Sequence, residues 1–417
     1  MILSVIIVNY NVKYFLEQCL YSVEKALQEL ARQAAGPIPL AATEVFVVDN
    51  HSSDGSIDYL RPMFPRVRFI ANKDNLGFAR ANNQALAGAG GQNILFLNPD
   101  TILPEDFFRV CLSFIQTEPG AGALGVRMID GSGRFLKESR RGFPSPWVAF
   151  CKLTGLTALL PHSRLFANYY LGHLDADRNH PAPILSGACM WIRREALDKA
   201  GSFDEQFFMY AEDIDLSHRI EQAGYCNYYI ADTTILHFKG ESTRKDARYV
   251  RLFYKAMSQF RQKHFSGGLS ALFNGLMEIA IWLRAGITAM AGTLLRGRRR
   301  IPQSQKGATL QSLQTISGKE KTWISGDPQE ATRLAALLSS RGERVLVARE
   351  QEAAEIIYCE GPAYSFKESI AALQKRDGRI PCKIHAAGSG SAVGSSSKEE
   401  QGQAIVLLPL HPNGTVF

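Results

Sequence analysis

Three acidic residues, Glu212, Asp213 and Asp215, fall within four positions of the stretch FFMYAEDIDLSHRIEQAGY, residues 207–225. They follow a run of aromatic residues and begin a segment that we expect to be helical. The helix dipole favours carboxylates in a first turn, which explains part of this clustering. Aromatic surroundings and neighbouring like charges also raise a carboxyl pKa, which suits a general base. The segment therefore predicts either helix capping or a catalytic centre.

A second candidate centre is LFLNPDT, in which a buried strand is followed by Asn98, Pro99 and Asp100. Pro99 ends the strand, because proline cannot donate to a sheet hydrogen bond. A carboxylate there suits Mg²⁺ or Mn²⁺, which proteins hold with one or two carboxylates, water and substrate phosphates. His237, after a strand in ILHFKGEST, is a second candidate ligand because imidazole binds Mn²⁺. A structural role for this lone histidine is the alternative.

Further polar residues indicate a nucleotide-binding edge. Asp49 ends the strand in VVDNHSSDGS, where it can accept hydrogen bonds from a base or ribose. Ser52 and Asp54 could equally well belong to this site or simply form a turn and cap the next helix. In NKDNLGFARANN, Gly77 permits close backbone approach. Arg80 on the following helix can hold a phosphate with two hydrogen bonds or be a surface charge.

Alternating strands and helices must position these residues. Strands are expected within residues 3–10, 42–50, 66–73 and 92–100, and helices within residues 14–33 and 77–89. Short apolar strands separated by helices predict an α/β fold with a mostly parallel sheet covered on both faces. Ligands bind beyond the carboxyl ends of such strands. The polar residues at those ends are Asn9, Asn11, Asp49, Asn50, Asn72, Asn75, Asn98 and Asp100. They predict one functional edge.

The composition is that of a soluble globular protein with two or more domains in 417 residues. Much of the net charge of +7 comes from the arginine cluster at 296–300, so nucleic acid is not an expected partner. Seven cysteines without a C-x-x-C pair indicate neither a zinc site nor a disulfide framework. They favour a reducing compartment. The apolar start, MILSVIIVNYN, lacks a basic region and is expected to be a strand rather than a signal peptide.

The second half of the chain is expected to add accessory parts. Residues 130–183 look like a long loop region with short helices, of the kind that shapes a substrate pocket. Residues 246–300 are expected to be helical. Within them, 269–295 form a helix with a narrow polar stripe, which packs on the catalytic domain, lies on an anionic membrane surface, or spans the membrane. Residues 301–317 have the composition of a linker. Residues 318–417 are expected to form a small α/β domain.

This small domain lacks a G-x-G-x-x-G sequence after its first strand, so dinucleotide binding is not supported. It is expected to contain a helix from Pro328 to Ser340 and a Gly/Ser-rich insertion at 388–397. No chemistry is assigned to it.

Residues 1 to about 240 resemble the family 2 glycosyltransferases with the GT-A fold, especially their bacterial rhamnosyltransferase-like branch. Five stretches in the family's order carry the resemblance: VIIVNYN, VVDNHSSDGS, NLGFARANN, LFLNPDT and GSFDEQFFMYAEDIDLSHRIEQAGY, followed by His237. The resemblance implies a GT-A catalytic domain over residues 1–245. It also implies an inverting transfer from a nucleotide-diphosphate sugar, assisted by a divalent metal, Mg²⁺ or Mn²⁺.

The resemblance further implies roles for individual residues. The acid after Glu in the family's E-D motif is the catalytic base, which here is Asp213, with Glu212 beside it. The family's D-x-D metal motif appears as Asn98-Pro99-Asp100 without its first acid, so Asp100 and His237 are the implied metal ligands. The donor-binding residues are then Asn9, Asp49, Asn50, Asn75, Gly77, Arg80 and Asn98. The residues assigned to the acceptor pocket are Asp215, Gly187 and Trp191.

We therefore expect an inverting, metal-dependent glycosyltransferase that acts in surface polysaccharide synthesis with rhamnose or a related donor sugar. The expected acceptor is a glycan or lipid-linked glycan. A cytoplasmic protein is expected, with residues 269–300 as a peripheral contact to the inner face of the cytoplasmic membrane. A hexose or galactofuranose donor is the alternative within this class. A catalytically inactive nucleotide-binding scaffold is the alternative from another class.

Overall fold

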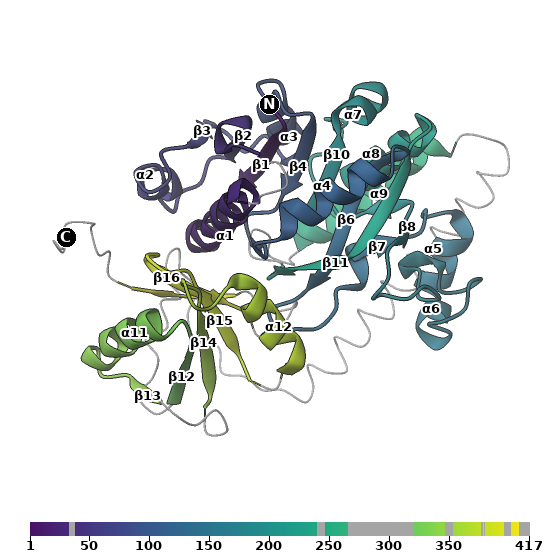
Figure 1. Cartoon of the computed structure of the whole chain (residues 1–417). Coiled ribbons are helices and arrows are strands. Elements are labelled where there is room, and N and C mark those ends of the chain that lie inside the picture. Colours follow the sequence, from purple (N-terminus) through teal and green to yellow (C-terminus); the bar gives the residue numbers. More distant parts are fainter. Residues whose placement is uncertain are drawn as a thin grey trace.

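The computed structural model describes residues 1–32, 38–239, 247–265, 321–346, 353–376, 378, 380–395 and 402–407. These residues form two domains, each built on its own sheet (Figure 1). The N-terminal sheet has the order β3-β2-β1-β4-β10-β6-β11-β5, and the C-terminal sheet has the order β13-β12-β14-β15-β16-β17. The expected α/β fold with a small C-terminal α/β domain is confirmed.

The first half of the N-terminal sheet is parallel, as the sequence predicts. Its strands are β1 (Leu3–Asn9), β2 (Thr43–Asp49), β3 (Val67–Ala71) and β4 (Asn93–Leu97). Every residue of β1, β2 and β4 is buried, because helices cover both faces of these strands. β1 lies between β2 and β4, with Asn9 opposite Asp49. Both residues are therefore at the carboxyl edge where the donor site is expected.

The second half of the sheet is mixed and brings the two candidate metal ligands together. Its strands are β5 (Thr101–Ile102), β6 (Ala121–Ile129), β8 (His180–Pro181), β10 (Cys189–Arg193) and β11 (Cys226–His237). β10 is antiparallel to β4 and β6, whereas β11 is parallel to β6. β5 pairs with the end of β11, where His237 lies opposite Thr101. This pairing places Asp100 beside His237.

Helices cover both faces of this sheet. They are α1 (Lys13–Arg32), α2 (Ser56–Leu60), α3 (Phe78–Leu86), α4 (Phe107–Thr117), α7 (Arg194–Ala200) and α8 (Glu212–Gln222). Neighbouring residues of β1 enter two separate cores. Val5 packs in the core that contains α1 and α4, and Ile6 packs in the core that contains α3, α7 and α8. Two buried faces explain why the strands are apolar throughout rather than alternating.

Residues 130–183 form a long connection with short helices, as expected. It contains η2 (Lys137–Ser139), β7 (Arg140–Arg141), α5 (Pro146–Leu153), α6 (Leu156–Leu159) and η3 (Asn168–Tyr170). β7 pairs with β9 (Ile184–Leu185), while α5 and α6 lie beyond the strands at the right of Figure 1. A Cβ on Gly142 would lie 2.2 Å from the carbonyl oxygen of Asn168. Glycine therefore allows the segment after β7 to lie directly against η3.

The helix α9 (Ala247–His264) follows the N-terminal sheet in sequence and packs against α8. Phe260 belongs to the same buried cluster as Phe207, next to α8. The helix and linker expected between residues 269 and 317 lie outside the described residues. Within the described parts of the chain, no helix combines the length and the apolar character needed to cross a membrane.

The C-terminal domain is a second α/β unit. Its strands are β12 (Lys321–Gly326), β13 (Arg344–Leu346), β14 (Glu355–Cys359), β15 (Cys382–His385), β16 (Ser391–Gly394) and β17 (Gln403–Val406), and its helices are α11 (Pro328–Ser340) and α12 (Phe366–Arg376). The helix predicted from Pro328 to Ser340 is confirmed. Asp327 caps it by accepting hydrogen bonds from the N–H groups of Gln329 and Glu330, each at 3.0 Å.

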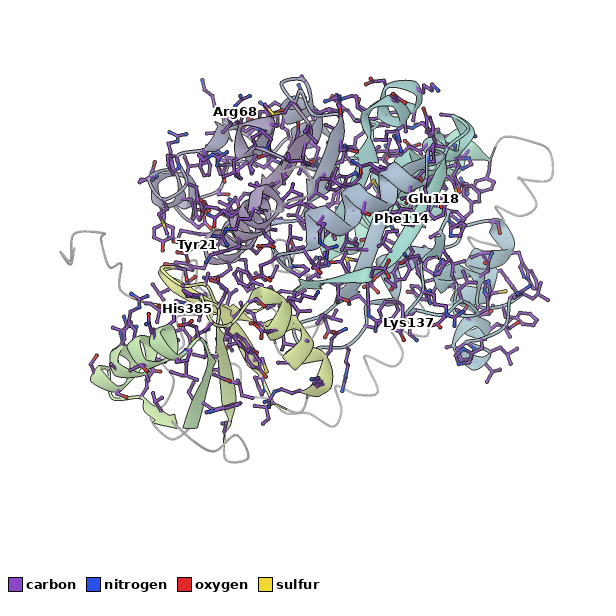
Figure 2. The ribbon with its side chains drawn as sticks, viewed as in Figure 1. Tyr21, Arg68, Phe114, Glu118, Lys137 and His385 are labelled. Carbon is purple, nitrogen blue, oxygen red and sulfur yellow. The ribbon has the colours of Figure 1, made fainter. Side chains whose placement is uncertain are left out.

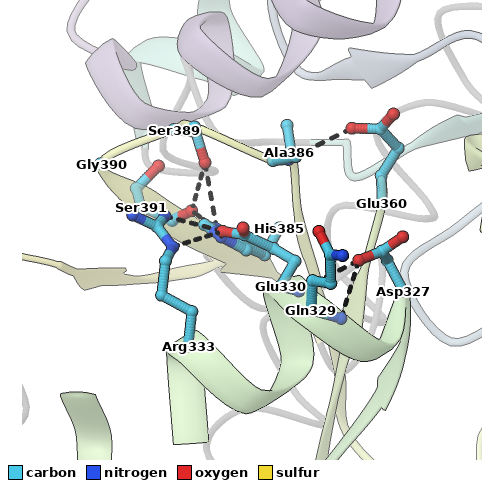
Figure 3. A network of polar contacts seen from close by, with 12 residues as sticks. Asp327, Gln329, Glu330, Arg333, Glu360, His385, Ala386, Ser389, Gly390 and Ser391 are labelled. Carbon is cyan, nitrogen blue, oxygen red and sulfur yellow. Dashed lines mark hydrogen bonds and ion pairs between the residues drawn. The ribbon is translucent and has the colours of Figure 1, made fainter. Parts of the chain in front are cut away.

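Figure 3 shows the polar contacts that tie α11 to the strands of this domain. Glu330 on α11 lies 2.8 Å from His385 on β15 and 2.7 Å from Arg333. The other ring nitrogen of His385 lies 2.7 Å from the carbonyl oxygen of Ser391 on β16. Burial raises the pKa of Glu330, but the hydrogen bonds to His385 and Arg333 outweigh burial and bring it to about 2. The group is thus a structural network that reaches from the exposed Arg333 to the buried His385.

A polar interface joins the C-terminal domain to α1. The Gln18 side chain donates to Ser389 Oγ at 2.8 Å and accepts from the Ala386 N–H at 2.8 Å. Tyr21, labelled at the boundary of the two domains in Figure 2, donates its hydroxyl to the same segment at 3.1 Å. Residues 388–395 of the Gly/Ser-rich stretch therefore provide β16 and the contact with α1, rather than a free insertion.

An apolar interface continues behind the candidate metal ligands. Ile102 and Phe238, which follow those ligands in β5 and after β11, share one buried cluster with Phe366 of α12. Glu105 accepts hydrogen bonds from the N–H groups of Phe366 and Lys367, at 2.7 and 3.0 Å. Glu105 of the N-terminal domain thus caps α12 of the C-terminal domain, and the two domains share a buried core.

Candidate active site

A cavity of about 280 Å³ opens at the carboxyl edge of the N-terminal sheet. Its wall combines strand ends, the segment that leads into β10 and the segment that leads into α8. The candidate residues in this wall are Asn50, Asn75, Asn98, Asp100, Gly187, Glu212, Asp213 and His237. The candidate base and the candidate metal ligands therefore face one space.

Asp213 is held by three hydrogen bonds at the start of α8. Its Oδ2 accepts from Arg141 Nη2 at 2.5 Å and from the Gly187 N–H at 3.1 Å. Its Oδ1 accepts from the Ile214 N–H at 2.8 Å. A Cβ on Gly187 would lie 3.2 Å from Asp213 Cβ, so the glycine allows this close contact. These three hydrogen bonds fix the orientation of the Asp213 carboxylate.

The backbone immediately before α8 is strained. Tyr210 and Ala211 have φ angles of 71° and 66°, in the left-handed region that residues other than glycine seldom adopt. Such conformations cost on the order of 1–3 kcal/mol each and cluster at functional sites. The turn directs Glu212 and Asp213 into the cavity, since both line it. The strain is thus coupled to the placement of the acidic pair.

Glu212 and Asp213 have different electrostatic surroundings. Glu212 is 6% exposed; burial, and then the charge of Asp213, raises its pKa to about 8. Burial lowers the pKa of Arg141, but the Asp213 carboxylate and then Tyr169 outweigh this effect and raise it. At neutral pH Glu212 is therefore mostly protonated, while Asp213 is paired with Arg141. Separation of two carboxyl groups in this way allows one to act as a base.

Asp100 and His237 meet in the wall of the same cavity. Asp100 Oδ1 lies 3.4 Å from His237 Nε2, and Asn98 Nδ2 lies 3.5 Å from the same nitrogen. Asp100 and His237 are both buried, and His237 Nδ1 has no hydrogen-bond partner among the described residues. Among the residues that the structure describes, no three His, Cys, Asp or Glu side chains are grouped so that they could hold a metal ion. One carboxylate and one imidazole fit Mg²⁺ or Mn²⁺ completed by water and diphosphate oxygens.

Amide side chains form the wall on the donor side. Asn50 Nδ2 donates to Asn75 Oδ1 at 3.0 Å and to the Gly77 carbonyl oxygen at 3.1 Å. Gly77 has a φ of 84°, and a Cβ there would lie 2.5 Å from the carbonyl oxygen of Phe208. The close backbone approach predicted for Gly77 is therefore made by the aromatic segment before α8. This contact joins the donor-side loop to the segment that carries the acids.

Asn9 and Asp49 lie behind this wall. Asn9 Nδ2 donates to Asp49 Oδ1 at 2.7 Å, and the Ser52 N–H donates to Asp49 Oδ2 at 2.9 Å. Both residues are buried, and the cavity wall within the described residues does not include them. Asp54 accepts from the Lys13 N–H at 2.9 Å and from the Ser56 N–H at 3.1 Å. The structure thus shows Asn9 and Asp49 as organisers of the loop between β2 and α2.

Two predicted site residues lie away from the cavity. Trp191 is completely buried between the sheet and α4, near Phe107, and its indole N–H donates to Asn93 at 3.2 Å. β10 turns this side chain into the core, so its position does not support the assignment to the acceptor pocket. Arg80 is 62% exposed and lies 3.9 Å from Glu205. It is therefore the surface charge that was the alternative, and its predicted phosphate contact is not supported.

The position of Asp215 also does not support its assignment to the acceptor pocket. Its fully buried carboxylate lies 2.8 Å from Arg219, 2.8 Å from Lys263 and 2.7 Å from His264. Burial raises the pKa of Asp215, but the hydrogen bonds from Lys263 and His264 lower it below its usual range. Asp213 and Asp215 are two residues apart, about 200° around the helix, and so face opposite sides. Asp215 therefore fastens α9 to α8.

The sequence analysis did not identify Arg141 as a site residue. Arg141 lies in β7. The pairing of β7 with β9 brings its side chain to Asp213. Tyr10 and Tyr210 also line the cavity and were not predicted. The sequence offered one indirect signal for Arg141, the richness of the 130–183 region in arginine and aromatic residues.

The chain is similar to known glycosyltransferases. Residues 4–201 match the family model described as Glycosyl transferase family 2. The chain is 29% identical over 315 residues to N-acetylglucosaminyl-diphospho-decaprenol L-rhamnosyltransferase of Mycobacterium tuberculosis (strain ATCC 25618 / H37Rv), covering 72% of this chain and 96% of the relative. It is 25% identical over 177 residues to rhamnosyltransferase WbbL of Escherichia coli (strain K12), covering 40% of this chain and 63% of the relative.

Two solved structures were also matched. The mannosyltransferase PcManGT from Pyrobaculum calidifontis, in complex with GDP-Man and Mn2+, has a TM-score of 0.43 and 19% identity, covering 70% of this chain and 75% of that one. S. aureus TarS 1-349 has a TM-score of 0.40 and 18% identity, covering 58% of this chain and 62% of that one. The family match over most of the N-terminal domain, with the similarity to the mycobacterial enzyme over nearly its full length, leads to one conclusion. Residues 4–201 form a domain of the glycosyltransferase family 2 type.

Proposed function

We propose that the chain is an inverting, divalent-metal-dependent transferase that moves rhamnose or a related sugar from a nucleotide-diphosphate donor to a lipid-linked acceptor. The observation that carries the proposal is the shared cavity, in which Asp213 faces Asp100 and His237. A base on one wall and a diphosphate-binding edge on the other leave the space between them for the transferred sugar.

The protein's own residues supply the proton transfer in this proposal. Asp213 takes the proton of the acceptor hydroxyl on Oδ1, the oxygen that does not bond to Arg141. The hydroxyl oxygen then attacks the anomeric carbon from the face opposite the diphosphate, which inverts the configuration. Arg141 keeps Asp213 ionised and oriented until the proton arrives. Neutral Glu212 adds no second negative charge to the cavity.

The opposite wall binds the leaving group. Asp100 and His237 would hold Mg²⁺ or Mn²⁺, whose charge stabilises a departing diphosphate. Asn98, beside His237, has an amide group that can orient a phosphate or sugar hydroxyl. Asn50 and Asn75 line the donor end, and the loop organised by Asn9 and Asp49 supports it from behind. Fixed alignment of the two substrates supplies much of the remaining rate enhancement.

Similarity to two rhamnosyltransferases supports rhamnose as the donor sugar. The name of the mycobacterial relative includes a diphospho-decaprenol acceptor, which supports a lipid-linked acceptor and a location on the inner face of the cytoplasmic membrane. A hexose or galactofuranose donor remains the alternative within the class. An inactive nucleotide-binding scaffold is disfavoured by the intact acidic pair and metal edge in one cavity.

A donor screen tests the proposal. Purified full-length protein is incubated with a panel of nucleotide-diphosphate sugars, with and without Mn²⁺, and release of the nucleoside diphosphate is measured. We expect metal-dependent release from one donor, with the rhamnose donor preferred. Release from a hexose or galactofuranose donor alone would contradict the donor assignment. Binding of nucleotide without release from any donor, in the presence of lipid-linked acceptors, would favour the scaffold.

A further inference from the structure

Exposed apolar side chains are concentrated on the helical pair α5–α6. Of the six large hydrophobic residues that are exposed among the described side chains, five lie between residues 147 and 165. They are Trp147, Phe150, Leu159, Leu160 and Leu165, here called the α5–α6 surface. Leu159 is 74% exposed and Leu165 is 58% exposed. Apolar side chains gathered in this way on a water-soluble domain mark an interaction site.

Contacts within the pair hold this surface in one conformation. The rings of Trp147 and Phe150 stack with their centroids 5.8 Å apart. The Trp147 indole N–H donates to the carbonyl oxygen of Leu165 at 3.0 Å, which joins α5 to the segment after α6. Thr157 Oγ1 donates to the carbonyl oxygen of Phe166 at 2.8 Å. The apolar groups are therefore presented by a built structure.

The charge of this segment indicates what it binds. No aspartate or glutamate occurs between Glu138 and Asp175, whereas Lys152 and the exposed Arg164 lie within the helical pair and the turn that follows it. Tryptophan, phenylalanine and leucine beside basic residues are the composition of elements that insert into the interface of an anionic bilayer. Anionic headgroups would repel carboxylates at this surface, and the segment has none. Charge complementarity thus favours a membrane surface over a protein partner.

The α5–α6 surface is also continuous with the catalytic centre. Lys152 Nζ on α5 lies 3.4 Å from the centre of the Tyr169 ring on η3. Tyr169 lies close enough to Arg141 to contribute to its raised pKa, and Arg141 donates a hydrogen bond to Asp213. Three side chains therefore lead from the apolar surface to the candidate base. A lipid-linked acceptor emerging from a bilayer beneath α5–α6 would meet this side of the cavity.

We propose that the α5–α6 surface docks on the anionic face of a lipid bilayer and so presents a membrane-held acceptor to Asp213. The proposal rests on the lipid-linked acceptor of the proposed function. It differs from the sequence-based expectation that residues 269–300 make the membrane contact.

Flotation of the full-length chain with vesicles tests the docking without any turnover. The vesicles contain equal parts of phosphatidylcholine and phosphatidylglycerol, with pure phosphatidylcholine vesicles as the neutral arm. We expect the double variant Leu159→Glu, Leu165→Glu to bind the anionic vesicles at least ~10-fold more weakly, since two exposed leucines no longer enter the lipid. Ala336→Glu, an exposed position on α11, is the matched control for added charge and should bind like the parent.

Each other outcome overturns the docking proposal. Equal flotation of the double variant and the parent would assign membrane contact, if any, to another segment. A changed molar mass of the free variant would place a second copy on the surface. A lowered melting temperature of the double variant with unchanged flotation would show that the chain's own residues cover the α5–α6 surface. A parent that floats but uses no donor would instead contradict the proposed function, so the two failures are distinguishable.

Discussion

Arg141 Nη2 and Asp213 Oδ2 lie 2.5 Å apart, and each side chain is only 14% exposed. The candidate base is therefore ion-paired in the free protein. Because Glu212 next to it is neutral at physiological pH, the pair Arg141–Asp213 is electrically balanced within the cavity. The arginine comes from the connection between β6 and β10, so this region contributes directly to the reaction centre.

Asp213→Asn tests the base. The amide has nearly the same shape and still accepts a hydrogen bond, but it cannot take a proton. We expect kcat to fall by at least ~10², a typical contribution of a general base. The Kd of the donor, measured by calorimetry, should change little. Asp198→Asn, at an exposed position on α7, is the control and should leave kcat unchanged. Retained turnover in Asp213→Asn would remove the assignment.

Arg141→Gln and Arg141→Lys test the positioning role. Loss of the guanidinium disfavours the ionised carboxylate of Asp213, so the acid limb of the pH–rate profile should move to higher pH. We expect kcat to fall ~10-fold or more in Arg141→Gln, in line with the loss of a charge-assisted hydrogen bond. Arg141→Lys keeps the charge and should recover part of the rate. Equal pH profiles for parent and Arg141→Gln would show that Arg141 is only structural.

Glu212→Gln tests the raised pKa of the buried acid. A carboxyl group whose pKa is higher in the folded than in the unfolded protein stabilises the fold in acid, and this contribution is lost as pH rises. The parent should therefore lose stability between about pH 4.5 and 8, and Glu212→Gln should lose less. Melting temperatures across this range measure the difference. The alkaline limb of the parent's pH–rate profile should also flatten in the variant.

Glu221→Gln provides the comparison for this experiment. Burial raises the pKa of Glu221 to about 7, but the residue lies on α8 away from the cavity wall. We expect Glu221→Gln to reduce the loss of stability with pH while leaving the pH–rate profile unchanged. If Glu212→Gln behaves in the same way as Glu221→Gln, then Glu212 has no part in catalysis.

Chelation and substitution test the metal edge. Treatment with EDTA should abolish transfer, and Mn²⁺ should restore it. With two protein ligands, loss of one should weaken metal binding strongly, and we expect His237→Gln to raise the Mn²⁺ concentration for half-maximal rate by at least ~10-fold. His162→Gln, outside the cavity, is the control. Full activity of the parent after exhaustive chelation would contradict a metal role for Asp100 and His237.

Gln18→Leu tests whether the two domains unfold together. The substitution leaves the Ala386 N–H without its buried partner. An unsatisfied buried group of this kind costs about 1–3 kcal/mol. We expect the free energy of unfolding to fall by about that amount, with one cooperative transition in urea. Gln28→Leu, half-buried on the same helix, is the control. Two separate transitions in the parent would show that the interface contributes little to stability.

Local patterns in the sequence were sufficient to predict the first strands and helices of the N-terminal domain. A parallel strand buried on both faces must be apolar throughout, and β1, β2 and β4 have that pattern. Polar residues at the carboxyl ends of such strands must meet at one edge, which is why Asn50, Asn98 and Asp100 share a cavity wall. The chain pattern likewise determined the helix from Pro328 to Ser340, since Asp327 and the proline provide its N-terminal signals.

The tertiary structure decided which residues reach the reaction centre. Asp215 has the same side chain as Asp213, but helix geometry turns it toward His264. Trp191 is buried because of the core around β10, which residue type alone does not reveal. Arg141 reaches Asp213 only because β7 pairs with β9. Local sequence determines strands, helices and caps through short-range hydrogen bonds and apolar spacing, whereas contacts between distant segments depend on how the whole chain packs.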